Sequence, residues 1–339
     1  MSTPTRTRVL HRFHLPTVLV LSSIIGVLVG LAVTATEPIP GLPVPDGLVR
    51  VGLPIVRVLL DMAAVVTVGL CLLPILIGFD RPKLAEPLLA GVRRIGVAAP
   101  LVWAVAAFIA LVLQTAELYP GEEVSGGAIA DYVDAVGAGK ALVFVVVAAL
   151  VCAALGALTV RFGEQVPAEL RTAVAMLALL PLPVTGHATN WRWHDFTMIS
   201  MELHVMSAVA WTGGLGAVVV LLAGNRTLLA GALPRFSKLA TGCLLVVTAT
   251  GLFNGIVELT VAPGVSFVDA LFGDGYGLLV LIKAVCVVGL AALGATIRWR
   301  LMPAIVAHGR TALIGWAAIE LAVMGVAFGI AVVLTRTPV

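Results

Sequence analysis

Nine long apolar runs, separated by short polar loops, constrain this chain of 339 residues more than any other feature of its sequence. A helix needs about 20 residues to cross a hydrocarbon core of roughly 30 Å, and most of the runs reach that length. Only 12% of the residues are charged, against about 25% in soluble domains. The sequence therefore predicts an all-α, polytopic transmembrane bundle within the lipid bilayer and excludes nucleic acid as a partner. The runs cover residues 16–35, 53–79, 95–116, 140–160, 170–185, 197–223, 236–259, 276–297 and 311–334.

The runs form a single integral membrane domain over residues 1–339, because no loop is long enough to hold a soluble domain. Within it we distinguish the first five helices (1–184) from the last four (185–339). The fifth run is short, and its Pro181 and Pro183 predict a bent or unwound end that other helices cover. For the first run, a cleavable signal peptide is the alternative to an uncleaved helix.

Lysine and arginine alternate between the loops in a way that predicts the orientation of the chain. Cytoplasmic loops are enriched in these residues. With the N-terminus inside, fifteen of the 21 lie in cytoplasmic segments, whereas the outer segments hold only Arg50, Lys140, Arg192 and Arg336. We therefore expect a cytoplasmic N-terminus and an extracytoplasmic C-terminus.

Six polar residues lie inside the expected spans, where an ionisable or hydrogen-bonding group is expensive and is a functional candidate by default. Asp61, Glu202, His204 and Lys283 lie about 8–12 Å from the outer ends of their helices, at 1.5 Å per residue. They form either an ion-pair network that fixes helix packing or a polar cavity open to the outside. The full set is Asp61, Glu202, His204, Asn254, Lys283 and Glu320.

Histidine and methionine gather where an outer loop enters the sixth run. If that helix extends back to His194, then His194, Met198, Met201 and His204 share one face within an arc of roughly 120°. Imidazole and thioether are ligands that suit copper, Cu(I) in particular, whereas hard cations prefer oxygen. His187 in the loop extends the cluster. Ordinary packing by these side chains is the alternative, and zinc bound by histidines and a carboxylate also stays open.

The cysteines, by contrast, are far apart in the sequence. Cys71, Cys152, Cys243 and Cys286 each lie in a separate apolar run without metal-type spacing, and we interpret them as packing residues. No serine or cysteine has a recognisable base and orienting acid. The sequence therefore predicts no catalytic residues and no enzyme.

Several short motifs, in a fixed order, resemble the copper resistance protein D (CopD) family. The resemblance is strongest from about Thr185 to the C-terminus, while the first half resembles actinobacterial members mainly in hydropathy. The motifs are Gly186-His187, His194, Leu203-His204, Trp211-Thr212-Gly213-Gly214-Leu215, Arg235-Phe236-Ser237-Lys238-Leu239-Ala240, Thr250-Gly251-Leu252-Phe253-Asn254-Gly255, Tyr276-Gly277, Leu281-Ile282-Lys283, Arg298-Trp299-Arg300-Leu301-Met302-Pro303 and Glu320.

The resemblance implies a multi-pass protein of the bacterial cytoplasmic membrane that takes up or handles copper, often with a small periplasmic copper-binding protein. It implies copper at His187, His194 and His204, with Lys283 and Glu320 as intramembrane polar partners. Some actinobacterial relatives continue into a cytochrome oxidase assembly domain. We expect any such assembly factor to be a separate protein here.

Three functions follow as hypotheses. The first is a copper permease in which His187, His194 and Met198 receive the ion and Met201 and His204 take it into the membrane. The second is a haem-binding oxidoreductase that uses His204. The third is an accessory protein that holds copper for oxidase assembly without transporting it.

Overall fold

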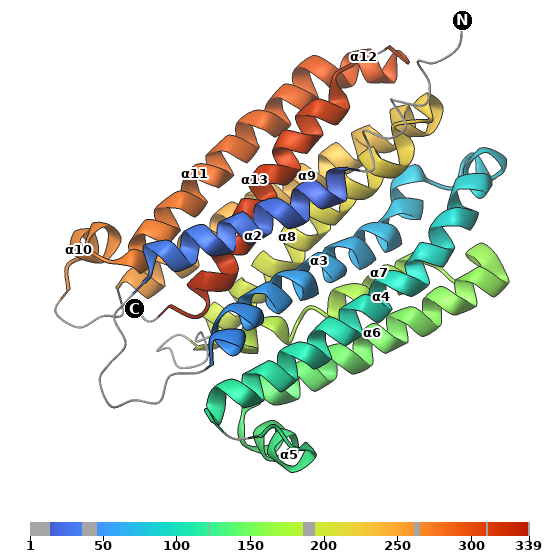
Figure 1. The fold of residues 1–339 in the computed structure, drawn as a ribbon. Helices are drawn as coiled ribbons and strands as arrows, with labels where there is room; N and C mark the ends of the chain where they lie inside the picture. The colour runs from blue at the N-terminus through green and yellow to red at the C-terminus, as the bar shows by residue number, and fades with distance from the viewer. Residues whose placement is uncertain are drawn as a thin grey trace, which may run out of the picture.

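The computed structural model describes residues 14–35, 46–121, 123–185, 194–260, 265–309 and 311–337, and these residues are helical and contain no strand (Figure 1). Nine of the described helical segments are long and apolar enough to cross a membrane, which confirms the predicted all-α bundle. Eight of the nine are long helices: α2 (Leu15–Val33), α3 (Gly47–Ile77), α4 (Pro82–Leu118), α6 (Gly137–Phe162), α8 (His194–Leu222), α9 (Arg226–Leu259), α11 (Gly275–Thr296) and α13 (Leu313–Leu334). The ninth is the segment Ala168–Thr185, which contains a shorter helix and a 3₁₀ turn.

Shorter helices complete the chain. A π-helical turn at Ile297–Leu301 continues α11 and leads into α12. Amphipathic α5 and the short α10 lie in loops between spans, where serine side chains at Ser125 and Ser266 cap their first turns. The shorter elements are α5 (Gly126–Ala135), α7 (Ala168–Leu177), α10 (Phe267–Phe272) and α12 (Met302–Val306), with 3₁₀ turns at Gly163–Gln165 and Leu182–Thr185.

Some helices begin earlier than the apolar runs indicate. Helix α4 begins at Pro82 and α9 at Arg226, whereas the corresponding runs begin at residues 95 and 236. Hydropathy misses these first turns because they are basic and extend beyond the apolar stretch. The end of the fifth span is unwound, as Pro181 and Pro183 predict. Helix α7 ends at Leu177, and the chain continues through turns to the 3₁₀ turn at Leu182–Thr185.

Helices α3 and α8 pack together in the middle of the molecule, with α4 and α6 on one side and α9, α11, α13 and α2 on the other (Figure 1). Gly69 of α3 and Gly213 of α8 allow this packing, because a Cβ on either would run into the backbone of the other helix. Of the nine candidate spans in the described residues, α3 is the most enclosed. The central helices are therefore the ones best placed to line an internal site.

Glycines also join the first and last spans. A Cβ on Gly26 of α2 would meet the Val326 carbonyl of α13, and a Cβ on Gly325 of α13 would overlap Ser22 of α2. The small-residue pairs at Gly26/Gly30 and Gly325/Gly329 thus permit close helix packing.

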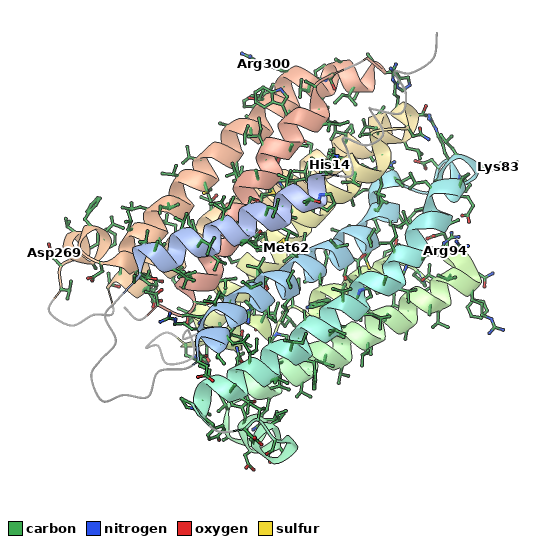
Figure 2. The ribbon with its side chains drawn as sticks, viewed as in Figure 1. His14, Met62, Lys83, Arg94, Asp269 and Arg300 are labelled. Carbon is green, nitrogen blue, oxygen red and sulfur yellow. The ribbon has the colours of Figure 1, made fainter. Side chains whose placement is uncertain are left out.

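The charged loops lie at opposite ends of the bundle. Figure 2 shows Lys83, Arg94 and Arg300 at one end, which we call the basic end, and Asp269 at the other, which we call the acidic end. Lys83, Arg94 and Arg300, which the positive-inside rule groups as cytoplasmic, thus lie at the same end of the bundle. The orientation in a membrane stays a prediction.

Candidate functional site

A partly open cavity of about 180 Å³ lies between α3, α8, α11 and α13, with room for several water molecules. Four of the predicted polar or sulfur-bearing residues line it: Asp61, Met201, His204 and Lys283. Apolar side chains such as Phe328 and Val287 make up much of the remaining wall. The structure thus brings together residues from three helices that the sequence placed at similar depth.

The His204 imidazole forms a hydrogen bond that determines which of its ring nitrogens carries the lone pair. Its Nδ1 lies 2.9 Å from Oγ1 of Thr250 on α9. The Thr250 hydroxyl already donates to the Val246 carbonyl at 2.6 Å, so it has no second proton and must accept from His204 Nδ1–H. In the neutral ring the lone pair is then on Nε2, the arrangement found when a histidine binds a metal.

Gly251 leaves the space that the His204 ring occupies. A Cβ at this position would lie 3.1 Å from His204 Cε1, closer than an ordinary van der Waals contact. Gly251 and Gly255 have the four-residue spacing that is typical of glycines at helix–helix contacts. For Gly251, the structure shows that the close neighbour is the imidazole.

Met201 lies one helical turn before His204 and also lines the cavity. Its thioether accepts a weak hydrogen bond from Asn254 Nδ2 at 3.9 Å. Asn254 itself is buried on α9, and its Oδ1 has no hydrogen-bond partner among the described residues. Thr250 and Asn254, one turn apart on α9, therefore each contact one of the two candidate ligands on α8.

The carboxylate of Asp61 pairs with Arg57 on its own helix, at 3.5 Å. The ion-pair network considered from the sequence would have joined Lys283 to Glu202 or Asp61 and gave Arg57 no role, although the i,i+4 spacing is a recognised signal for such a pair. Arg57 also donates to the Leu182 carbonyl at 3.3 Å and to the Thr185 hydroxyl. These bonds hold the end of the fifth span against α3 and cover the acidic end of the cavity.

Lys283 projects from α11 into the cavity and forms no ion pair with any residue that the structure describes. Arg57 and Lys283 bring two positive charges to the lining, against one negative charge from Asp61. The site therefore carries a positive excess. A cation in this cavity needs strong ligands to offset the repulsion.

The remaining predicted residues do not line the cavity. Helix α8 begins at His194, as the shared face requires, but His194 is exposed at its start, and Met198 and Glu202 are half-buried outside the cavity lining. His187 lies outside the described residues. Within the described ranges, no three His, Cys, Asp or Glu side chains are grouped as a metal site.

Glu320 of α13 is buried and also lies outside the cavity lining. The Trp211 indole of α8 is close enough to interact with its carboxylate, but the two do not reach hydrogen-bond geometry. Sequence reasoning also missed Tyr276, which lines the cavity and hydrogen-bonds to buried Glu258 of α9. Tyr276 had been noted only as part of the Tyr276-Gly277 motif, and no role had been assigned to its side chain.

Two family models match the chain. The model for copper resistance protein D matches residues 230–334, and the model for the copper resistance protein D-like N-terminal domain matches residues 48–195. The chain belongs to the copper resistance protein D family. The N-terminal match extends the resemblance over the first half, where hydropathy had been its main support.

A relative from Bacillus subtilis (strain 168), described as copper transport protein CutJ, is 32% identical over 122 residues. This match covers 34% of the chain and 21% of the relative, so the aligned part spans about a fifth of that protein. No solved structure matches.

The matched ranges of the copper resistance protein D family surround the cavity. The N-terminal range contributes Arg57 and Asp61 to the cavity lining, and the C-terminal range contributes Lys283. The C-terminal range also contains Thr250 and Asn254, which contact His204 and Met201. Met201 and His204 lie between the two ranges. This family member is therefore a multi-pass helical protein whose two family segments meet around one cavity.

Proposed function

We propose that this protein carries copper, as Cu(I), across the bacterial cytoplasmic membrane through the cavity on α8. The observation that carries the proposal is that Met201 and His204, three residues apart on α8, line the same cavity, while the hydrogen bond from His204 Nδ1 to Thr250 places the lone pair of the neutral ring on Nε2. A thioether and an imidazole are donors that Cu(I) accepts. Their position inside the membrane suits an ion in transit rather than an ion bound at the surface.

The weakness of the site supports transport over storage. Two protein ligands beside an excess of positive charge bind a copper ion less tightly than a closed cage of ligands does. Passage through the membrane requires such sites, because they release the ion again. Asn254 positions the Met201 thioether, and Asp61 offsets part of the charge of Arg57 and Lys283. Lys283 then acts as an electrostatic gate that limits how long a cation stays.

The acidic end supplies the entry in this proposal. His194 is exposed there at the start of α8, with Met198 one turn further in, and His187 precedes them in the chain. They would receive copper from a periplasmic copper-binding protein and pass it to Met201 and His204. Glu202 and Glu320 would serve as polar groups along the way, and copper reaching an oxidase-assembly factor would pass through a separate protein.

A haem role is less well supported by the cavity. Its volume of about 180 Å³ is below the roughly 300–1,000 Å³ of pockets that enclose drug-sized ligands. Among the described histidines, His204 is the one that lines the cavity, so no facing pair is available there to hold haem on both sides. We therefore propose a transporter rather than an enzyme.

The test is Cu(I) flux into liposomes that contain the purified protein, with bound copper and the visible spectrum measured on the same sample. We expect His204→Ala to reduce flux and copper affinity by at least about 100-fold, because it removes a direct ligand rather than an outer partner. The matched control is His308→Asn, at the basic end, where φ is 59° and asparagine is well tolerated. Unchanged flux in His204→Ala would refute the proposal, binding without flux would indicate the accessory role, and a haem spectrum would indicate the oxidoreductase.

A further inference from the structure

Two cysteines from different helices meet at a second, smaller cavity near the basic end. Cys71 of α3 and Cys152 of α6 both line this cavity of about 30 Å³, and both are free thiols. The sequence separates them by 81 positions, so they were interpreted as isolated packing residues. Only the packing of α3, α4 and α6 brings them to the same space.

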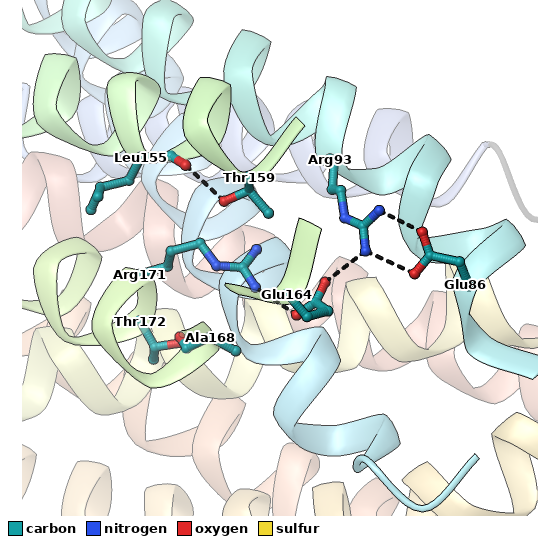
Figure 3. A network of polar contacts seen from close by, with 8 residues as sticks. All are labelled: Glu86, Arg93, Leu155, Thr159, Glu164, Ala168, Arg171 and Thr172. Carbon is teal, nitrogen blue, oxygen red and sulfur yellow. Dashed lines mark hydrogen bonds and ion pairs between the residues drawn. The ribbon is translucent and has the colours of Figure 1, made fainter. Parts of the chain in front are cut away.

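Glu86, Arg93, Glu164 and Arg171 form a network of charged side chains (Figure 3), and the last three of them line this cavity. Arg93 of α4 forms a two-bond pair with Glu86, at 2.6 and 2.9 Å, and a third bond to Glu164 at 3.1 Å. Arg171 of α7 binds the other oxygen of Glu164, also at 3.1 Å. The two positive and two negative charges balance.

Two buried donors in this network lack an acceptor. The Nε atoms of Arg93 and Arg171 have no hydrogen-bond partner in the described chain, and each arginine side chain is only 10% exposed. Both residues line the cavity that holds the thiols. A buried N–H without an acceptor is unfavourable and needs an explanation, and an anionic group in the cavity would supply one.

We infer that Cys71 and Cys152 form a second Cu(I) site, in which the two sulfurs bind one ion beneath the arginine network. The identity of the metal rests on the proposed function. The cavity has room for one or two water molecules, so it fits a single ion and not a larger ligand. Binding releases both thiol protons, and the resulting bis-thiolate copper complex carries one negative charge that the two free Nε–H groups can stabilise.

Helix α3 links the two sites. Asp61 lines the larger cavity and Cys71 the smaller one, and their separation of ten positions corresponds to about 15 Å along the helix. Ala64 also lines the larger cavity, and at seven residues before Cys71 it lies on nearly the same helical face. The thiol site is therefore positioned to accept copper that leaves Met201 and His204, at the opposite end of the bundle from His194.

X-ray absorption at the copper edge, on selenomethionine-labelled protein loaded with Cu(I), tests this inference. In such protein a copper–selenium shell reports methionine ligation, whereas a copper–sulfur shell comes from cysteine alone. We expect both shells in the wild type. Cys71→Ser/Cys152→Ser should lose the copper–sulfur shell and about one bound copper per chain, while keeping the copper–selenium shell.

The matched control is Cys243→Ser/Cys286→Ser, which leaves Cys71 and Cys152 as the only cysteines. It should retain the copper–sulfur shell, and it decides the question even if the first variant fails to fold. Absence of that shell in the wild type or the control, or its survival in Cys71→Ser/Cys152→Ser, would overturn the inference. Failure of the proposed function alone would leave the copper–sulfur shell intact with no flux.

Discussion

The cavity around His204 and the network around Glu164 both place charged groups inside a helical bundle, but they differ in how completely those groups are paired. In the network, each carboxylate contacts a guanidinium at 2.6–3.1 Å and the charges cancel. In the cavity, Lys283 has no ion-pair partner among the described residues. Paired charges fix helices in place, whereas unpaired polar groups around a space leave capacity for a ligand.

We expect the largest effect from a substitution that breaks the network around Glu164. Glu164→Gln removes the carboxylate shared by Arg93 and Arg171, so it should reduce the free energy of unfolding by about 2 kcal/mol, between the values for exposed and buried pairs. Thermal unfolding in detergent measures this. Glu86→Gln, at a carboxylate that is 54% exposed, should have a smaller effect and serves as the control. Equal losses would mean that Glu164 does not bridge the two arginines.

An intermediate effect tests the orientation of His204. Thr250→Val removes the oxygen that accepts from Nδ1–H and frees the ring to turn, so the affinity for Cu(I) should fall about tenfold, the lower end of the range for such partners. Competition with a Cu(I)-specific chelator measures the change. Thr248→Val, on the exposed face of the same helix, should leave the affinity unchanged. An equal loss in both variants would contradict the tautomer argument.

The smallest expected effect has the opposite sign. Lys283→Met removes a positive charge from the cavity and should raise Cu(I) affinity about fivefold, because about 1 kcal/mol of repulsion is lost. The same chelator competition measures it, together with slower release in the flux assay. Lys83→Met, at the basic end, is the control. Weaker binding in Lys283→Met would show that Lys283 supports the site instead of opposing the cation.

The comparison also separates what could be predicted from what could not. The Met201/His204 pair follows from helical spacing alone, since both lie on one face of a single helix. The partners Thr250 and Asn254 needed the structure, because spacing within one helix does not say which neighbouring helix a side chain faces. Arg57 was within reach of an i,i+4 argument, whereas Thr250 carries no charge or periodic signal that marks it.

The sequence by itself determined the membrane-spanning helices, the separation of basic and acidic loops, and the shared face of His194, Met198, Met201 and His204. Each depends on hydropathy or helical periodicity, which are local properties of the chain. Tertiary structure alone decided that His204 contacts Thr250, that Lys283 has no ion-pair partner in the described residues, and that Cys71 and Cys152 line one cavity. These outcomes depend on which helices pack together, and close packing at Gly69 and Gly213 helps to decide that.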